Sequence, residues 1–229
     1  TITGYFGNRR RKGPVPTQPA TASSAPIDVH GGSIQAFYDQ GITWGKCAPG
    51  TFDSYRGVDS SDPSEYQCAF LKAPLDWDNP DGDQISLALA IHRSGKKDAP
   101  ALFVNPGGPG GSGVDLVLAY QNDAGAIGKL NETHDLIGFD PRGVGVSLPF
   151  AQCETNAERD KARELLYTGT PEEIAKKLRA GTESSVNGCF NNTGRIFGFD
   201  ADGRKDLLYH LGTSTAVRDI DTLRPIMGA

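Results

Sequence analysis

A glycine-rich segment, residues 105–113, has a composition that can stabilise negative charge. It consists of Asn-Pro-Gly-Gly-Pro-Gly-Gly-Ser-Gly and directly follows the apolar run Ala101–Val104. Glycine has no Cβ, so a ligand can come close to the backbone. Backbone N–H groups presented in this way bind a phosphate or stabilise the oxyanion of an acyl-transfer intermediate. The identity of that anion decides the class of function.

A phosphate would indicate a dinucleotide-binding domain. Residues Gly108–Gly113 satisfy the pattern G-x-G-x-x-G between a predicted strand and a predicted helix, and Asp140 ends the next predicted strand, where an acid could hold a ribose. Two predicted strands and two cysteines precede this unit, however, and Asp140 lies farther away than the ~20 residues expected. A P-loop is excluded because no Gly-Lys-Ser/Thr follows. Dinucleotide binding through Gly108–Gly113 is therefore the alternative, and an oxyanion loop is the preferred hypothesis.

The overall composition excludes several kinds of partner. The chain has 229 residues, a formal net charge of −5, 37% hydrophobic residues and 22% charged residues. This charge gives no electrostatic reason to bind nucleic acid or an anionic membrane. No apolar run approaches the ~20 residues of a membrane span. The cysteines show no CxxC spacing, so we expect no zinc site, and we expect no cofactor.

The cysteines and two sequons indicate an oxidising compartment. The simplest pairing of the four cysteines is Cys47 with Cys68 and Cys153 with Cys189. Sequons at Asn131 and Asn191 predict glycosylation and point in the same direction. We therefore expect a secreted protein. The alternative is a cytosolic protein with four buried thiols.

The chain divides into four segments. We expect a flexible leader over residues 1–35 because this stretch is rich in Pro, Ser, Thr and basic residues, with folded sequence starting near Ile42. Residues 36–150 contain the predicted strands and a helix after the glycine loop. The first two strands, at 66–75 and 84–92, are expected to be antiparallel. The short strand 101–104, expected in the centre of the sheet, forms a parallel βαβ unit with the strand at 134–140.

The second part of the chain is predominantly helical. We expect residues 151–205 to form a helical insertion that a disulfide closes. Its helices are predicted at 156–167 and 171–186, and the second helix starts at a proline. Residues 206–229 predict a helix that returns to the core. It starts with the capping residues Thr213-Ser-Thr and has apolar spacing at Val217, Ile220 and Leu223.

Several motifs occur together in the order of a known family. They are Trp44…Cys47, Cys68-Ala69, Pro74-Leu-Asp-Trp77, Leu102–Gly113 and Asp135–Ser147. Together they resemble the amino-terminal half of the secreted tripeptidyl-aminopeptidase branch of the α/β-hydrolase serine peptidases, relatives of prolyl aminopeptidases, over residues 42–229.

The resemblance implies the fold class, the substrate and the roles of several residues. The implied fold is the amino-terminal half of an α/β-hydrolase, with a mostly parallel sheet and antiparallel first strands. The implied substrate is a peptide with a free amino terminus. Gly108 would supply an oxyanion-hole N–H. The turn residues Asp140, Arg142, Gly143 and Gly145 would be structural.

The catalytic triad of that family is not present in this chain. The family places its nucleophile on a G-x-S-x-G elbow, followed by Asp and His, and the sequence contains no such elbow. The nearest imitation is Gly212–Ala216, centred on Ser214, after residues 207–211 that could form a strand. All four histidines precede the expected position of a catalytic His: His30, His92, His134 and His210.

We therefore expect this chain alone to be inactive. Its implied partner is the missing carboxy-terminal half of the same protein, and the chain is expected to end before the nucleophile strand. An esterase or another α/β-hydrolase, or a non-catalytic binding protein, remains an alternative.

Overall fold

The computed structural model describes residues 33–47, 66–119, 126–165, 168–193 and 205–228. Nearly all of the expected leader lies outside these residues. The described fold begins earlier than expected, with helix α1 (Ile34–Asp39) rather than near Ile42. This helix buries Phe37, whose ring lies edge-on to Trp77 with centroids 5.9 Å apart. A short helix of this kind is stabilised by its tertiary contacts, which local sequence does not reveal.

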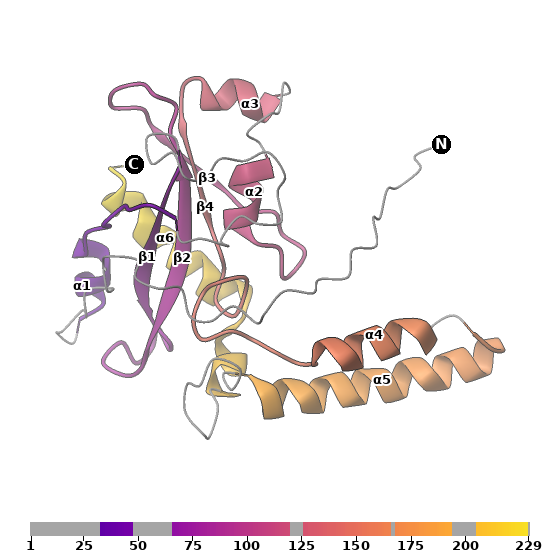
Figure 1. The fold of residues 1–229 in the computed structure, drawn as a ribbon. Coiled ribbons are helices and arrows are strands. Elements are labelled where there is room, and N and C mark those ends of the chain that lie inside the picture. The colour runs from indigo at the N-terminus through magenta and orange to yellow at the C-terminus, as the bar shows by residue number, and fades with distance from the viewer. Residues whose placement is uncertain (1–32, 48–65, 120–125, 166–167, 194–204, 229) are drawn as a thin grey trace.

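Four strands form one mixed sheet with the order β1-β2-β4-β3 (Figure 1). Strands β1 (Tyr66–Pro74) and β2 (Gln84–His92) are antiparallel, as expected, and β3 (Ala101–Val104) runs parallel to β4 (Asp135–Phe139). The expectation that β3 is central is wrong for the described part of the chain. It lies at the edge of the sheet, and its four residues are only half-buried.

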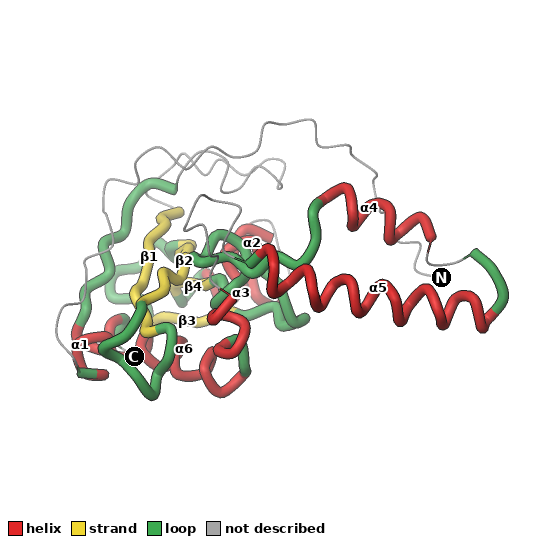
Figure 2. The backbone as a smooth tube through the Cα atoms, turned by 90° about the horizontal axis from the view of Figure 1, so that it is seen from below, coloured by secondary structure: helices red, strands yellow, loops and turns green. Residues whose placement is uncertain are grey.

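Helices cover both faces of this sheet, which makes the architecture α/β. Successive residues of β2 alternate between the faces, as strand geometry requires. Leu87 and Leu89 join one apolar cluster with Leu223 of α6 (Thr213–Ile226). Ala88 and Ala90 join a second cluster with α2 (Gly113–Ala119). Figure 2 shows α1 and α6 across the sheet from α2, with α3 (Ala126–Asn131) beside α2.

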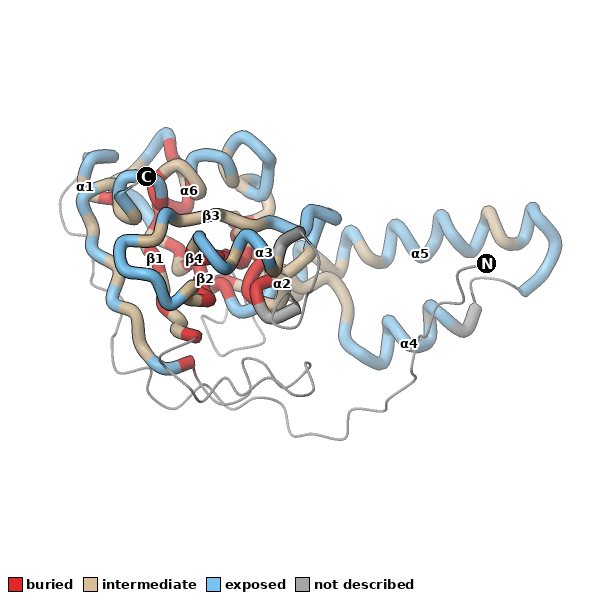
Figure 3. The backbone as a smooth tube through the Cα atoms, turned by 90° about the horizontal axis from the view of Figure 1, so that it is seen from above, coloured by how far each residue is buried: buried red, intermediate tan, exposed pale blue. Residues whose placement is uncertain are grey.

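The segment that was expected to be a helical insertion contains two helices that project from the body of the molecule as an arm (Figure 3). It consists of α4 (Asn156–Leu165) and α5 (Pro171–Asn192), and none of the described α5 residues is buried. The predicted start of α5 is correct: Thr170 and Glu173 form a capping box, although the helix runs on past Val186. Among the described residues, no helix is long and apolar enough to cross a bilayer.

Two disulfides join the expected cysteines. Cys153 pairs with Cys189, which ties the end of α5 to the segment before α4, and Cys47 pairs with Cys68 in β1. The described cysteines therefore include no free thiol. Both bridges close loops within the chain, which restricts its unfolded state.

The inward face of α6 differs from the expected apolar stripe. Val217 is 56% exposed, whereas Asp219 and Thr222 are fully buried beside Leu223. The helix is preceded by Gly212, and no side chain caps it, so the expected capping by Thr213 and its neighbours is wrong. A polar inner face is stable only if its groups find partners inside the protein.

Arg142, in the turn after β4, is the partner of Asp219. Its Nη2 and Nε atoms lie 2.7 and 2.8 Å from the two carboxylate oxygens of Asp219. Trp77 Nε1 donates to the same carboxylate at 2.9 Å. The remaining guanidinium donors reach the backbone carbonyls of Pro74 at 3.1 Å, Leu75 at 2.7 Å and His210 at 3.2 Å. Burial raises the pKa of the Asp219 carboxyl, and the Arg142 guanidinium acts in the opposite direction.

We expect Arg142→Met to lower the free energy of unfolding by roughly 3–5 kcal/mol, because it leaves a buried carboxylate without its cation. Urea denaturation followed by circular dichroism measures this change. Replacing both partners, Arg142→Met with Asp219→Leu, should cost less, because both desolvation penalties disappear.

The matched control is Arg218→Met, which removes an ion pair at 3.0 Å to Asp78, whose side chain is 85% exposed. Arg218→Met should lower the free energy of unfolding by less than about 1 kcal/mol. A loss for Arg142→Met as small as that of the control would contradict the role of the buried pair.

Candidate active site

The glycine loop leaves the carboxyl end of β3 and has a shape that requires glycine. Gly107, Gly108 and Gly110 have φ values of 74°, 123° and 96°. A Cβ on Gly108 would lie 3.2 Å from the backbone nitrogen of Gly110. Gly107 N donates to Asn105 Oδ1 at 2.9 Å, and Gly111 N donates to Gly107 O at 3.1 Å. The loop is therefore closed by hydrogen bonds among its own residues.

The N–H of Gly108 has no hydrogen-bond acceptor within the described part of the chain. Gly108 and its neighbours are exposed, so no side chain fills the space in front of them. In open α/β sheets, ligands bind beyond the carboxyl ends of the strands, which is where this loop lies. An unused N–H group at this position can donate to an anionic oxygen.

The far end of the loop is attached to β4. Ser112 Oγ accepts from Asp115 N at 2.9 Å, which caps the start of α2, and donates to Asp140 Oδ1 at 2.6 Å. A Cβ on Gly113 would fall on the backbone of Phe139. Strand β4 and the start of α2 can therefore approach this closely only because glycine stands at the contact.

The turn after β4 is held by the other oxygen of the same carboxylate. Asp140 Oδ2 accepts from Val146 N at 2.9 Å, and a Cβ on Gly145 would collide with this oxygen. Ser147 Oγ donates to Asp140 O at 2.6 Å and accepts from Ala88 N at 2.9 Å. These contacts give the turn residues roles within the fold rather than toward a substrate.

The structure does not support Ser214 as a nucleophile. Most of residues 207–211 belong to the 3-10 helix η1 (Lys205–His210), so they do not form the strand that an elbow needs. Ser214 lies in the first turn of α6. Gly212–Ala216 therefore only imitates an elbow in sequence and opens a helix instead.

The described histidines are also poorly placed for catalysis. His92 ends β2 and His134 precedes β4, so both lie at the end of the sheet opposite the glycine loop. The ring of His92 stacks on Tyr66 at 4.3 Å between centroids. His210 Nδ1 lies 4.0 Å from a carboxylate oxygen of Asp76. His30 lies outside the described residues.

The two sequons differ in their surroundings. Asn131 lies between His92 and His134. In the amide orientation that satisfies both ends of its side chain, its oxygen accepts from His92 Nδ1 at 3.2 Å, and its nitrogen donates to the carbonyl oxygens of His134 at 3.1 Å and His92 at 3.2 Å. A glycan on Asn131 would have to replace these bonds. Asn191 is exposed near the end of α5. Glycosylation of both residues stays a prediction.

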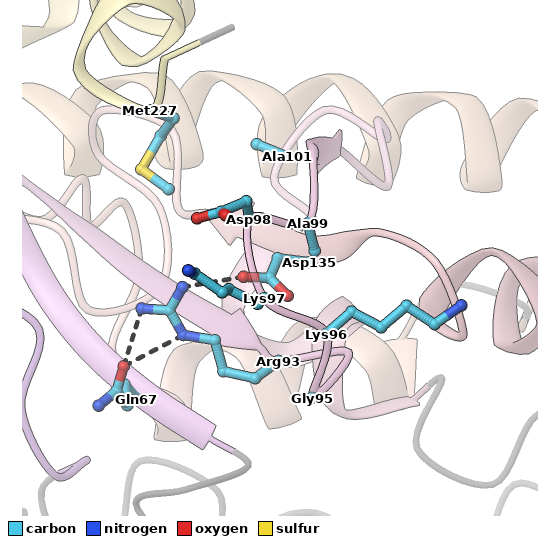
Figure 4. Close-up of a pocket in the computed structure, with 10 residues that line it drawn as sticks. All are labelled: Gln67, Arg93, Gly95, Lys96, Lys97, Asp98, Ala99, Ala101, Asp135 and Met227. Atoms are coloured by element: carbon cyan, nitrogen blue, oxygen red, sulfur yellow. Dashed lines mark hydrogen bonds and ion pairs between the residues drawn. The ribbon is translucent and has the colours of Figure 1, made fainter.

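A pocket lies at the opposite end of the sheet from the glycine loop (Figure 4). Arg93 there donates to Asp135 Oδ2 at 2.9 Å and to Gln67 Oε1 at 3.0 Å, which engages its charge within the fold. Lys96 extends away from this group in Figure 4. This pocket lies at the amino ends of the parallel strands, where α/β sheets do not normally place their ligands. The glycine loop is therefore the candidate active site.

Sequence reasoning proposed Gly108 as a donor, and that role stays a prediction, but it missed how the loop is positioned. The link from Ser112 to Asp140 and the pair of Arg142 with Asp219 both join residues far apart in sequence. One signal for the second pair was available: Asp219 lies four residues before the buried Leu223, on the same face of the helix.

We expect Gly113→Ala to lower the free energy of unfolding by roughly 1–3 kcal/mol, because its methyl group would force α2 away from β4. Thermal denaturation of the variant measures this. The control is Gly41→Ala, where nothing lies within 4 Å of the added Cβ; it should change stability by less than about 0.5 kcal/mol. Equal stability of the two variants would refute the close contact.

Comparison of the sequence with known proteins identifies relatives of this chain. No family model matches the chain. Serine protease Hip1 of Mycobacterium tuberculosis is 32% identical over 166 residues, which are 72% of this chain and 30% of that protein. Tripeptidyl aminopeptidase of Streptomyces lividans is 31% identical over 191 residues, 82% of this chain and 32% of that protein.

A third relative is carboxylesterase B of Mycobacterium tuberculosis, which is 34% identical over 169 residues, 73% of this chain and 30% of that protein. The chain thus spans about a third of the length of the curated relatives it matches. Over that third, it belongs to the tripeptidyl-aminopeptidase-like branch of the serine hydrolases.

Proposed function

We propose that this chain is the amino-terminal part of a secreted serine hydrolase that releases short peptides from free amino termini. The observation that carries the proposal is the N–H of Gly108, which lies at the carboxyl end of β3 without an acceptor among the described residues. Two relatives bear the names serine protease and tripeptidyl aminopeptidase, which supports peptide hydrolysis. The two disulfides support an extracellular location.

In the proposed reaction, a serine of the complete polypeptide attacks a peptide carbonyl carbon. The carbonyl oxygen becomes negatively charged in the tetrahedral intermediate, and the Gly108 N–H donates to it. In α/β-hydrolases the second donor is the backbone N–H that follows the nucleophile. An N–H group that is already oriented needs no reorganisation when the charge develops.

The proposed partner of this chain is the carboxy-terminal part of the same protein. Residues 36–150 would form the first part of the hydrolase core, residues 151–205 the inserted arm, and residues 206–229 the helix before the nucleophile strand. The exposed edge of β3 offers backbone groups for a further parallel strand. A fifth strand there would place β3 inside the sheet, as the sequence predicted.

An esterase is the second candidate, because one relative bears the name carboxylesterase B. An ester and a peptide pass through the same kind of oxyanion, so the role of Gly108 would be unchanged. Dinucleotide binding and a purely non-catalytic role receive no support from the names of these relatives.

Replacing the backbone amide of Gly108 by an ester tests this role directly. Incorporating glycolic acid at position 108 of the complete polypeptide removes the N–H and changes little else. We expect kcat for a chromogenic tripeptide substrate to fall about 10²–10³-fold with KM little changed, because the N–H acts on the transition state. The same exchange at Gly41 should leave kcat unchanged. An unaltered kcat at position 108 would exclude Gly108 as the donor.

The absence of a nucleophile from this chain is tested with a fluorophosphonate probe, which labels activated serines covalently. The chain alone should remain unlabelled, whereas the complete polypeptide should be labelled on a serine beyond Ala229. Ser214→Ala in the complete polypeptide should still be labelled. Labelling of the isolated chain that Ser214→Ala abolishes would contradict the proposal.

A further inference from the structure

We propose that Asp140 is a positioning residue that orients the Gly108 N–H through Ser112. The role rests on the proposed function, in which that N–H meets the oxyanion. It is carried by the contacts of one buried carboxylate with two separate loops, the glycine loop and the turn after β4.

The Asp140 carboxylate is buried with an exposure of only 1%. Oδ1 accepts from Ser112 Oγ at 2.6 Å and from Val114 N at 3.2 Å, and Oδ2 accepts from Val146 N at 2.9 Å. Among the described residues, no Lys or Arg forms an ion pair with it. Burying a carboxylate is costly unless donors compensate, so its contacts are specific rather than incidental.

Each oxygen holds a different segment. Oδ1 holds the junction between the glycine loop and α2, and Oδ2 holds the turn after β4. Because both oxygens belong to one planar group at the end of β4, the two segments have a fixed relative position. An amide side chain could not serve both, since one of its ends is a donor.

A short series of contacts connects this carboxylate to Gly108. Asp140 fixes Ser112, and the adjacent Gly111 donates its N–H to Gly107 O at 3.1 Å. Gly107 is the immediate neighbour of Gly108. A displacement of Ser112 is thus transmitted to the catalytic N–H over one hydrogen bond and a few backbone bonds. Misplacement by about 1 Å can cost ~10²-fold in rate.

The variants that test this are Asp140→Asn, Ser112→Ala and Ser112→Thr in the complete polypeptide. We expect Asp140→Asn and Ser112→Ala to lower kcat about 10–100-fold, with KM changed less than about threefold, because only transition-state contacts are lost. Ser112→Thr keeps the hydroxyl and should restore most of kcat.

The matched control is Ser147→Ala. Ser147 is buried, whereas Ser112 is half-buried. The Ser147 hydroxyl also makes two hydrogen bonds, to the backbone oxygen of Asp140 and from Ala88 N, but it does not touch the glycine loop. Ser147→Ala should lower the melting temperature about as much as Ser112→Ala does, and it should leave kcat unchanged. A loss of kcat in Ser147→Ala equal to that in Ser112→Ala would overturn the proposal, because the loss would then follow stability alone.

A second readout does not depend on activity. Hydrogen exchange of the Gly111 N–H in the complete polypeptide reports whether the loop stays closed on Gly107. We expect it to accelerate about tenfold or more in Asp140→Asn and Ser112→Ala but not in Ser147→Ala. Unchanged exchange in Asp140→Asn and Ser112→Ala would overturn the positioning role. An absence of hydrolysis by the wild type would refute the proposed function, and the exchange measurement would still test the positioning role.

Discussion

Two buried, opposite charges in the turn after β4 hold the described fold together. Asp140 binds the start of α2 on one face of the sheet, and Arg142 binds Asp219 of α6 on the other. Only one residue separates Asp140 from Arg142 in the sequence, so a single short turn fixes the helices on both faces of the sheet. Neither charge is exposed to water, and each therefore depends on the geometry of its partners.

The glycine loop depends on that arrangement. Its last residues are attached to Asp140 and β4, and its first residues are closed by Asn105, whereas Gly108 in between retains an unused N–H. A loop with two fixed ends and a free donor is suited to electrostatic stabilisation, because the cost of orienting the donor is met during folding. Glycine is required at Gly108 by its positive φ and at Gly113 by backbone contact.

Local patterns predicted much of the fold. The strand candidates at 66–75 and 84–92 correspond to β1 and β2, and Thr170 with Pro171 marked the start of α5. Features set by distant contacts were missed. Helix α1 exists because Phe37 packs on Trp77, and α6 turns Asp219 inward because Arg142 lies there. In the candidate site, the loop was evident from its composition. Its attachment to Asp140 was not, because Ser112 and Asp140 are 28 residues apart in sequence and their hydrogen bond leaves no local signal.

The central claim is that the Gly108 N–H faces the oxyanion. A crystal structure of the complete polypeptide, with its nucleophile phosphonylated by a tripeptide phosphonate, measures this directly. The phosphonyl oxygen occupies the position of the oxyanion, and the account predicts that Gly108 N lies about 2.7–3.1 Å from it. A Gly108 N–H that points elsewhere, with that oxygen bound by other donors, would contradict the account.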